Sequence, residues 1–276
     1  IELHADHVAI ETGTHEGPRH LFARRLVLAT GREGQAKPRI PEALAPFHGT
    51  LVRHSADDID FARLKDRHVV VLGLAASAFD NAATALEAGA AGVTMIGRAS
   101  AMPRLSKMKQ TVYPGFTHGF AALPDADKLA LLDHVMQHRI APPRASVLRI
   151  SSDPRARLVL GGELTGALPD GDGLALQTTE GEIAADLVIL GTGFEIDLEA
   201  SREIAGFADR ILRWGDRVPE ATGEWASFPY LGANFTFQAR EGHDVPGLGL
   251  VHCFTHAAQL SLGNLAEQGI NVVCYN

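Results

Sequence analysis

The stretch that decides the fold is "VVVLGLAASAFDNAATALEAGAAGVTMIGR", which runs from Val69 to Arg98. An apolar run leads into Gly73, a segment rich in small residues follows, and a second apolar run ends at Arg98. Runs of valine and leucine are typical of strands buried on both faces of a parallel sheet, and Gly89 is a natural helix end. The stretch therefore predicts a β-α-β unit of the kind that binds dinucleotides.

The turn after the first strand departs from the usual glycine pattern at one position. The first glycine of such a turn permits the tight bend, the second lets the backbone approach the pyrophosphate, and a small third residue lets helix and strand pack closely. Gly73 takes the first role, and Ala75 takes the second at the cost of one methyl group. Ser77 and Ala78 open the helix, where Ser77 could cap it or donate to a phosphate. These four residues form the predicted pyrophosphate site.

The residue that ends the second strand indicates which dinucleotide is bound. An acidic residue there hydrogen-bonds the ribose 2′-hydroxyl of NAD, whereas an arginine pairs with the 2′-phosphate of NADP. Arg98 stands at this position, so the sequence favours NADP. A plain β-α-β unit with a surface arginine is the alternative that these residues leave open.

The composition limits the classes of protein that the chain can belong to. Its 276 residues carry a net charge of −8 without a long basic run, which argues against nucleic acid or an anionic membrane as a partner. No apolar run reaches the ~20 residues that a membrane span needs. Two widely spaced cysteines, Cys253 and Cys274, predict a reducing, cytoplasmic compartment and exclude a CxxC redox pair. Because the sequence begins at Ile1, we expect its natural N-terminus to be missing.

Weaker patterns predict the other elements and the order of domains. Apolar strands end in Thr-Gly twice, in "LVLATG" and in "LVILGTG", on either side of the β-α-β unit. This echo predicts a chain that leaves one domain at Gly31, builds a second domain, and re-enters the first near Gly191. The remaining expected elements are short strands within residues 2–30, a helix over 127–138, strands at "VLRI" (147–150), "ARLVL" (156–160) and "LALQTT" (174–179), a strand over 247–254, and a helix from about Ser261.

Four motifs occur in a fixed order along the chain. They are "LVLATG" with "KPRIP", then "FHGTLVRHS", then "HVVVLGLAASAFDNA", and finally "LVILGTGFEID". In order and spacing they resemble the flavin-containing monooxygenase-like FAD/NAD(P)-binding oxidoreductases, which include N-hydroxylating and Baeyer–Villiger enzymes. The resemblance covers about residues 20–200. It implies an α/β fold of two interleaved Rossmann-like dinucleotide-binding domains, with the FAD domain incomplete at its N-terminus.

The resemblance also implies where the two cofactors bind. It implies a partial FAD domain with a linker over residues 1–60, an inserted NADP-binding domain over 61–186, and a return to the FAD domain over 187–276. For NADPH, it implies a pyrophosphate site at the turn of Gly73, Ala75, Ser77 and Ala78 and a 2′-phosphate contact at Arg98. Near the domain crossing and the flavin it places Thr30, Gly31, Thr192, Gly193 and Phe194.

Three features depart from the family pattern. The upstream strand–GxGxxG–helix that holds the FAD pyrophosphate is absent from this sequence, and so is the asparagine that many members place beside the flavin. The FxGxxxH signature begins at Phe47, but Arg53 occupies the histidine position and His54 follows one residue late. This shift weakens a Baeyer–Villiger assignment. We also expect residues 1–276 alone to bind FAD poorly.

Two histidines four residues apart raise the question of a metal site. His252 and His256 would share a face only on a helix, whereas "GLGLVHCF" is typical of a strand. The alternative is that His252, His256 and Gln259 line the flavin side of a domain interface. We therefore expect no metal site.

The expected reaction is a flavin-dependent oxidation of a small molecule. NADPH reduces FAD, and the flavin then activates O₂ and transfers one oxygen atom to a soft nucleophile or a ketone. The hard chemistry belongs to the flavin, so the sequence nominates no catalytic acid or base. Two alternatives stay open: an NADPH-dependent flavoprotein reductase without oxygenase activity, and a non-catalytic nucleotide-sensing module. The sequence does not indicate the oligomeric state.

The role of Ala75 can be tested by substitution. If its methyl group faces the pyrophosphate, Ala75→Gly leaves NADPH binding unchanged or improves it, because crowding is relieved. Ala75→Val impairs binding sharply, because two further methyl groups enter the same space. Calorimetric titration measures both effects. A valine variant that binds as tightly as the parent would place the cofactor elsewhere.

Overall fold

The structure is a computed structural model that describes residues 1–102, 113–137 and 141–263. The chain forms two compact units. Unit 1 consists of residues 1–37, 108–137 and 194–276, and unit 2 of residues 38–107 and 138–193. The chain passes from unit 1 to unit 2 after residue 37, within β5 (Ala36–Pro38), and returns to unit 1 after residue 193, at the start of β14 (Phe194–Ile196). These two strands pair with each other.

The division between the units has one feature that composition does not indicate. Helices α2 (Pro114–Gly119) and α3 (Asp125–Gln137) belong to unit 1, although the chain on both sides of them belongs to unit 2. The expected boundaries instead include both helices in the inserted domain over residues 61–186. Which cofactor each unit serves stays a prediction.

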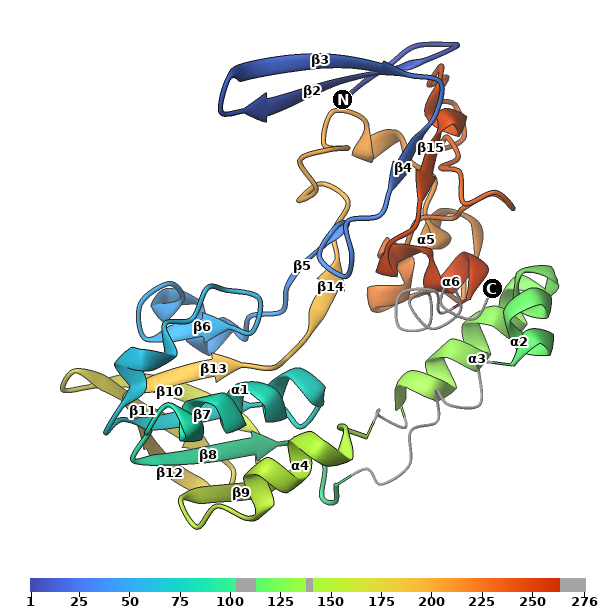
Figure 1. The fold of residues 1–276 in the computed structure, drawn as a ribbon. Helices are drawn as coiled ribbons and strands as arrows, with labels where there is room; N and C mark the ends of the chain where they lie inside the picture. The colour runs from blue at the N-terminus through green and yellow to red at the C-terminus, as the bar shows by residue number, and fades with distance from the viewer. Residues whose placement is uncertain (103–112, 138–140, 264–276) are drawn as a thin grey trace. The chain divides into compact units, whose positions relative to one another are not determined.

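Unit 2 is built on a five-stranded sheet in which every neighbouring pair is parallel (Figure 1). Its strand order is β6-β13-β7-β8-β9. The predicted β-α-β unit is confirmed, and so is the α/β fold class. The strands and the helix of this unit are β6 (Val52–His54), β7 (His68–Leu72), α1 (Ala76–Glu87), β8 (Gly92–Gly97), β9 (Ala156–Leu160) and β13 (Leu187–Leu190).

Alternate residues of β7 face two different layers. Val69 and Val71 pack with Phe79 and other apolar residues of α1, whereas Val70 and Leu72 pack with residues of an antiparallel meander. The meander consists of β10 (Leu164–Asp170), β11 (Gly173–Thr178) and β12 (Gly181–Ala185). Because side chains alternate along a strand, a continuous apolar run is what a sheet covered on both faces requires.

The prediction of a strand at residues 147–150 is wrong. These residues lie in α4 (Arg144–Ser151), which packs beside α1 (Figure 1). Val147 and Ile150 are three residues apart, so on a helix they share the face that packs into the apolar cluster of α1. The guanidinium of Arg149 donates two hydrogen bonds to Glu87, at 2.8 and 2.7 Å, and these fix α4 against α1.

Unit 1 combines small sheets with short helices around one apolar core. Buried aromatic rings, among them Trp214, Phe228 and Phe237, form the centre of this core. Within the described residues, the predicted helix over 127–138 is confirmed as α3, and no helix is both long and apolar enough to cross a membrane. The other strands and helices are β1 (Glu2–Leu3), β2 (Val8–Thr14), β3 (Gly17–Ala23), β4 (Leu26–Leu28), β15 (Val251–Cys253), α5 (Trp214–Arg217) and α6 (Gln259–Leu262).

The C-terminal predictions are confirmed only in part. Of the strand expected over residues 247–254, only β15 is extended, and residues 248–250 form a 3₁₀ turn. The helix expected from about Ser261 begins two residues earlier, as α6. The remainder of that prediction, from residue 264 on, lies outside the described residues.

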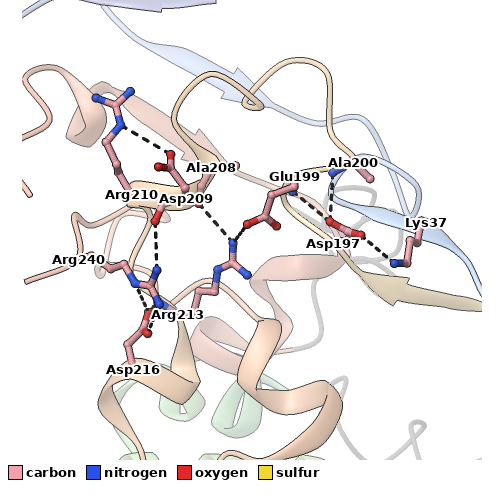
Figure 2. Close-up of polar contacts among 10 residues, drawn as sticks. All are labelled: Lys37, Asp197, Glu199, Ala200, Ala208, Asp209, Arg210, Arg213, Asp216 and Arg240. Atoms are coloured by element: carbon pink, nitrogen blue, oxygen red, sulfur yellow. Dashed lines mark hydrogen bonds and ion pairs between the residues drawn. The ribbon is translucent and has the colours of Figure 1, made fainter.

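Several charged side chains of unit 1 form a group of ion pairs and hydrogen bonds (Figure 2). Lys37 pairs with Asp197 at 2.9 Å, and Arg213 pairs with Glu199. Arg240 donates to both carboxylate oxygens of Asp216, with its Nε 3.0 Å from Oδ2. Burial raises the pKa of Asp216, but the hydrogen bonds from Arg240 and from the backbone N–H of Arg213 outweigh burial and hold the pKa below its ordinary value.

This ion pair predicts a pH-dependent contribution to stability. Asp216→Asn should lower the free energy of unfolding at pH 7 by about 1–2 kcal/mol, between the values typical of exposed and of well-ordered charged hydrogen bonds. Because the folded pKa is depressed, the contribution is fully present above the unfolded value of 3.8 and is lost as pH falls through the folded pKa. Urea unfolding between pH 7 and pH 3 measures it.

Asp209→Asn is the matched control, because the Asp209 side chain is 74% exposed and lies in the same network. We expect this variant to stay within about 0.5 kcal/mol of the parent. An Asp216→Asn deficit that did not shrink at low pH would contradict the assignment to the carboxylate charge.

Candidate functional site

Three backbone segments of unit 2 meet at the turn that follows β7. Gly73 has a φ of +127°, and a Cβ at this position would overlap the carbonyl oxygen of Gly191. A Cβ at Gly191 would in turn lie 2.5 Å from the Cβ of Ala78. Only glycines allow the end of β13, the β7 turn and the first turn of α1 to approach this closely. Ala78 is buried and takes the packing role expected of the third small residue.

The turn lies where ligands bind in open parallel sheets. From β7 the chain builds β8 and β9 on one side, passes through the meander, and returns on the other side of β7 as β13. The strand order therefore reverses between β7 and β13, and ligands of such sheets bind outside the carboxyl ends of the strands at this reversal. Gly73 follows the carboxyl end of β7, and Gly191 follows that of β13.

The N-terminus of α1 is open to solvent at this position. Ala75 is the N-cap residue, with an extended backbone (φ −95°, ψ −179°), and no side chain caps the helix. Of the two roles predicted for Ser77, the cap is therefore wrong, and donation to a phosphate stays a prediction: Ser77 lies exposed within the first turn. The first turn holds no acidic residue. Free backbone N–H groups and the positive end of the helix dipole make such a terminus suited to a phosphate.

Arg98 directly follows the carboxyl end of β8, the strand next to β7. Its side chain is exposed, and no carboxylate of the described residues pairs with it. Gly97 leaves room for Leu74, whose side chain would overlap a Cβ at that position. The turn and the arginine therefore lie at the same edge of one rigid sheet.

Thr192 and Gly193 are held by backbone groups of their own unit. The Thr192 hydroxyl donates to the carbonyl oxygen of Arg39, and the Gly193 carbonyl accepts from the Arg39 N–H at 2.9 Å. Nε2 of the buried His54 lies 3.0 Å from the same carbonyl, and its Nδ1 accepts from the N–H of Ala56 at 3.2 Å. His54 therefore carries its proton on Nε2 and fixes this turn. Phe194 begins β14 in unit 1.

In unit 1, a second parallel strand pair brings another set of predicted residues together. β4 pairs in parallel with β15, so both strands end at the same edge. Thr30 and Gly31, both exposed, follow β4. The loop then folds back tightly, because a Cβ at Gly34 would overlap the Thr30 hydroxyl.

Gln35 ties this loop to the end of β15. The buried Gln35 side chain accepts a hydrogen bond from the hydroxyl of Thr255 and lies 3.8 Å from the Cys253 sulfur. Its amide nitrogen lies 3.5 Å from the Ser201 hydroxyl. Burial raises the pKa of the Cys253 thiol, so this cysteine is neither a thiolate nor a nucleophile at neutral pH. Sequence reasoning missed Gln35, since nothing in a proline-rich connector marks a buried amide.

The two C-terminal histidines lie in different local structures. His252 lies in β15, where its Nδ1 contacts the carbonyl oxygen of Asn234 at 2.7 Å. His256 begins the 3₁₀ turn that follows, and its Nε2 lies 3.3 Å from the amide nitrogen of Gln259. Within the described ranges, no three His, Cys, Asp or Glu side chains cluster closely enough to hold a metal ion.

A curated protein is similar to this chain over most of its length. The FAD-dependent urate hydroxylase of Xanthomonas campestris pv. campestris is 30% identical over 248 residues, which are 88% of this chain and 52% of that protein. The chain therefore spans about half the length of this relative.

Solved structures share the fold at lower identity. A cadaverine monooxygenase of the desferrioxamine pathway from Erwinia amylovora, bound to FAD, has a TM-score of 0.68 and 18% identity, over 99% of this chain and 65% of that chain. An ornithine N-hydroxylase from Kutzneria sp. 744, with reduced FAD, NADP⁺ and L-ornithine, has a TM-score of 0.64 and 15% identity, over 98% and 67%.

The resemblance to flavin-containing monooxygenase-like proteins is confirmed by these comparisons. A family model described as L-lysine 6-monooxygenase/L-ornithine 5-monooxygenase matches residues 2–196, from the first strand of unit 1 to the return strand β14. The chain belongs to the L-lysine 6-monooxygenase/L-ornithine 5-monooxygenase family.

Proposed function

We propose that the chain functions as an NADPH-dependent flavin monooxygenase, in which unit 2 binds NADPH and unit 1 binds FAD. The observation that carries the proposal is the meeting of Gly73, Gly191 and Ala78 at the reversal of strand order in unit 2. It brings an uncapped helix N-terminus to the edge of the sheet where dinucleotides bind. Family membership adds the flavin and the oxygenase step.

NADPH fits the residues of unit 2. The backbone at Gly73, Ala75 and Ser77 is accessible at the start of α1, where a pyrophosphate can accept hydrogen bonds from the N–H groups. Arg98 lies at the end of the next strand and supplies the positive charge that a 2′-phosphate requires. The Ala75 methyl group is the one departure from a glycine-lined approach.

FAD fits the carboxyl edge of β4 and β15 in unit 1. Thr30 and Gly31 form the loop at this edge, and Nδ1 of His256, a buried polar atom, has no hydrogen-bond partner among the described residues. A ligand with acceptor atoms at this edge satisfies that nitrogen. FAD-bound and NADP⁺-bound proteins of the same fold support this pair of cofactors.

The chemistry is divided between the cofactor and the protein. When bound, FAD accepts a hydride from NADPH and activates O₂, which no protein side chain does by itself. The chain contributes binding, orientation and exclusion of water. We take a small nitrogen compound as the substrate, because the family and its relatives are named for lysine, ornithine, cadaverine and urate.

Oxygen consumption of the flavin-loaded protein tests this function. We expect NADPH oxidation coupled to O₂ uptake, with one of L-lysine, L-ornithine, cadaverine or urate converted to a hydroxylated product. NADPH oxidation that proceeds equally well without O₂, toward an added electron acceptor, would identify a reductase instead. NADPH binding without any turnover would identify a nucleotide-sensing module.

The choice of cofactor generates a separate prediction for Arg98. A charge-assisted hydrogen bond contributes about 1.5–3 kcal/mol, so Arg98→Ala should weaken NADPH binding about tenfold or more. Binding of NADH, which lacks the 2′-phosphate, should hardly change. Fluorescence titration with both nucleotides measures the two dissociation constants.

Arg63→Ala is the control, because Arg63 is another exposed arginine of unit 2 and its guanidinium pairs only with the neighbouring Asp60 among the described residues. It should change neither constant. Equal losses of NADPH and NADH binding in Arg98→Ala would remove the assignment of the 2′-phosphate to Arg98.

A further inference from the structure

We propose that Nδ1 of His256 donates a hydrogen bond to the isoalloxazine ring of FAD, which makes His256 a residue that positions the flavin and sets its reduction potential. This inference depends on the proposed function, because it takes FAD as the ligand of unit 1. It concerns one atom of one side chain, which neither the sequence motifs nor the family match assigns.

The hydrogen bonds around His256 leave one ring nitrogen without a partner. The side chain of Thr255 caps the turn in which His256 lies, accepting from the N–H of Ala257 at 3.3 Å. On the ring, Nε2 lies 3.3 Å from the amide nitrogen of Gln259, which has only protons to offer. Nε2 is therefore the acceptor, and the ring proton lies on Nδ1.

The proton on Nδ1 is buried and has no acceptor among the described residues. A buried donor without an acceptor keeps the full penalty of losing its water, so native structures rarely contain one outside a functional site. A ligand that offers an acceptor atom here removes this cost. This orphaned donor is the observation that carries the inference.

The ring is uncharged at neutral pH. Burial, together with the smaller effect of the positive charge of Arg32, lowers the pKa of His256 to about 4. A neutral imidazole donates through a single N–H. Such a donor suits the uncharged carbonyl and ring-nitrogen acceptors of a flavin better than it suits a phosphate, which charged donors hold more strongly.

The surroundings of His256 are suited to a flat aromatic ligand. It follows β15 at the carboxyl edge shared with Thr30, where ligands of parallel strands bind. At the same strand end, Phe254 is 45% exposed and stacks on Phe235, with ring centroids 4.2 Å apart. Phe235 has a φ of +63°, a conformation that is strained for a residue with a side chain. Strain of this kind is concentrated at ligand sites.

Two amides of different length distinguish the two ring nitrogens. Asn places its NH₂ near the position of Nδ1, whereas Gln reaches the position of Nε2. We therefore expect the FAD dissociation constant of His256→Asn to stay within about twofold of that of the parent holoprotein. Its midpoint potential should stay within about 10 mV of the parent value. His256→Gln and His256→Phe should weaken FAD binding about tenfold, the loss expected for one hydrogen bond.

The same two variants should also lower the midpoint potential. A donor to the isoalloxazine stabilises the electron-rich reduced ring more than the oxidised ring. A tenfold change in this preference corresponds to about 30 mV for a two-electron couple. Flavin absorbance during anaerobic reductive titration measures the potential, and equilibrium dialysis measures the dissociation constant. His243→Asn, at an exposed histidine of unit 1, is the control and should change neither value.

The outcomes separate this inference from the proposed function. A full-length parent protein that binds no FAD would contradict the proposed function itself. A parent that binds FAD, with unchanged affinity and potential in His256→Gln and His256→Phe, would overturn only the role of His256. Weaker binding at an unchanged potential would place the contact on the phosphates or the ribityl chain, and so overturn the assignment to the ring. Equal losses in His256→Asn and His256→Gln would overturn the assignment to Nδ1.

Discussion

The close approach of Gly73, Gly191 and Ala78 is the constraint on which unit 2 depends. Neither glycine position has room for a side chain, so β7, β13 and α1 can meet at backbone distance. This contact seats α1 on the sheet and leaves its first turn at the carboxyl edge. The packing of the unit and the proposed binding of the nucleotide therefore depend on the same three residues, and a substitution that moves the helix also moves the phosphate site.

The two candidate sites are built by different physical means. The site in unit 2 is formed by backbone groups that glycines bring together, with the charged side chain of Arg98 at the same edge of the sheet. The edge of β4 and β15 in unit 1 is instead held by hydrogen bonds among buried side chains, centred on Gln35 and Thr255. The site in unit 2 is therefore sensitive to substitutions that add volume. The edge in unit 1 is sensitive to substitutions that remove a hydrogen-bond donor or acceptor.

The parts of the fold that the sequence predicts are those decided within a short window. The run from Val69 to Leu72 is too apolar for any position but the centre of a sheet, and Gly73 marks its end. The short segment at 147–150, with three apolar residues, fits a strand or a helix equally well, and contacts with α1 across about 60 residues of chain decide for the helix.

The candidate sites, like the fold, contain some features that a short stretch of sequence predicts and others that depend on contacts between distant residues. The glycine turn and Arg98 are readable from their spacing along the chain. The partner of Gln35 lies 220 residues away, and the contact between Gly191 and Ala78 joins two separately predicted elements, so no local pattern indicates either one. The orphaned nitrogen of His256 likewise becomes visible only when the neighbouring hydrogen bonds are known.

Burial of Cys253 beneath the end of β15 has a consequence for the durability of the protein. Flavoproteins that reduce O₂ release hydrogen peroxide when the substrate is missing. Peroxide attacks thiolates, and the sulfur of Cys253 is both enclosed and protonated. The thiol next to the proposed flavin site is thus buried and protonated, and in this form it resists oxidation by hydrogen peroxide released there.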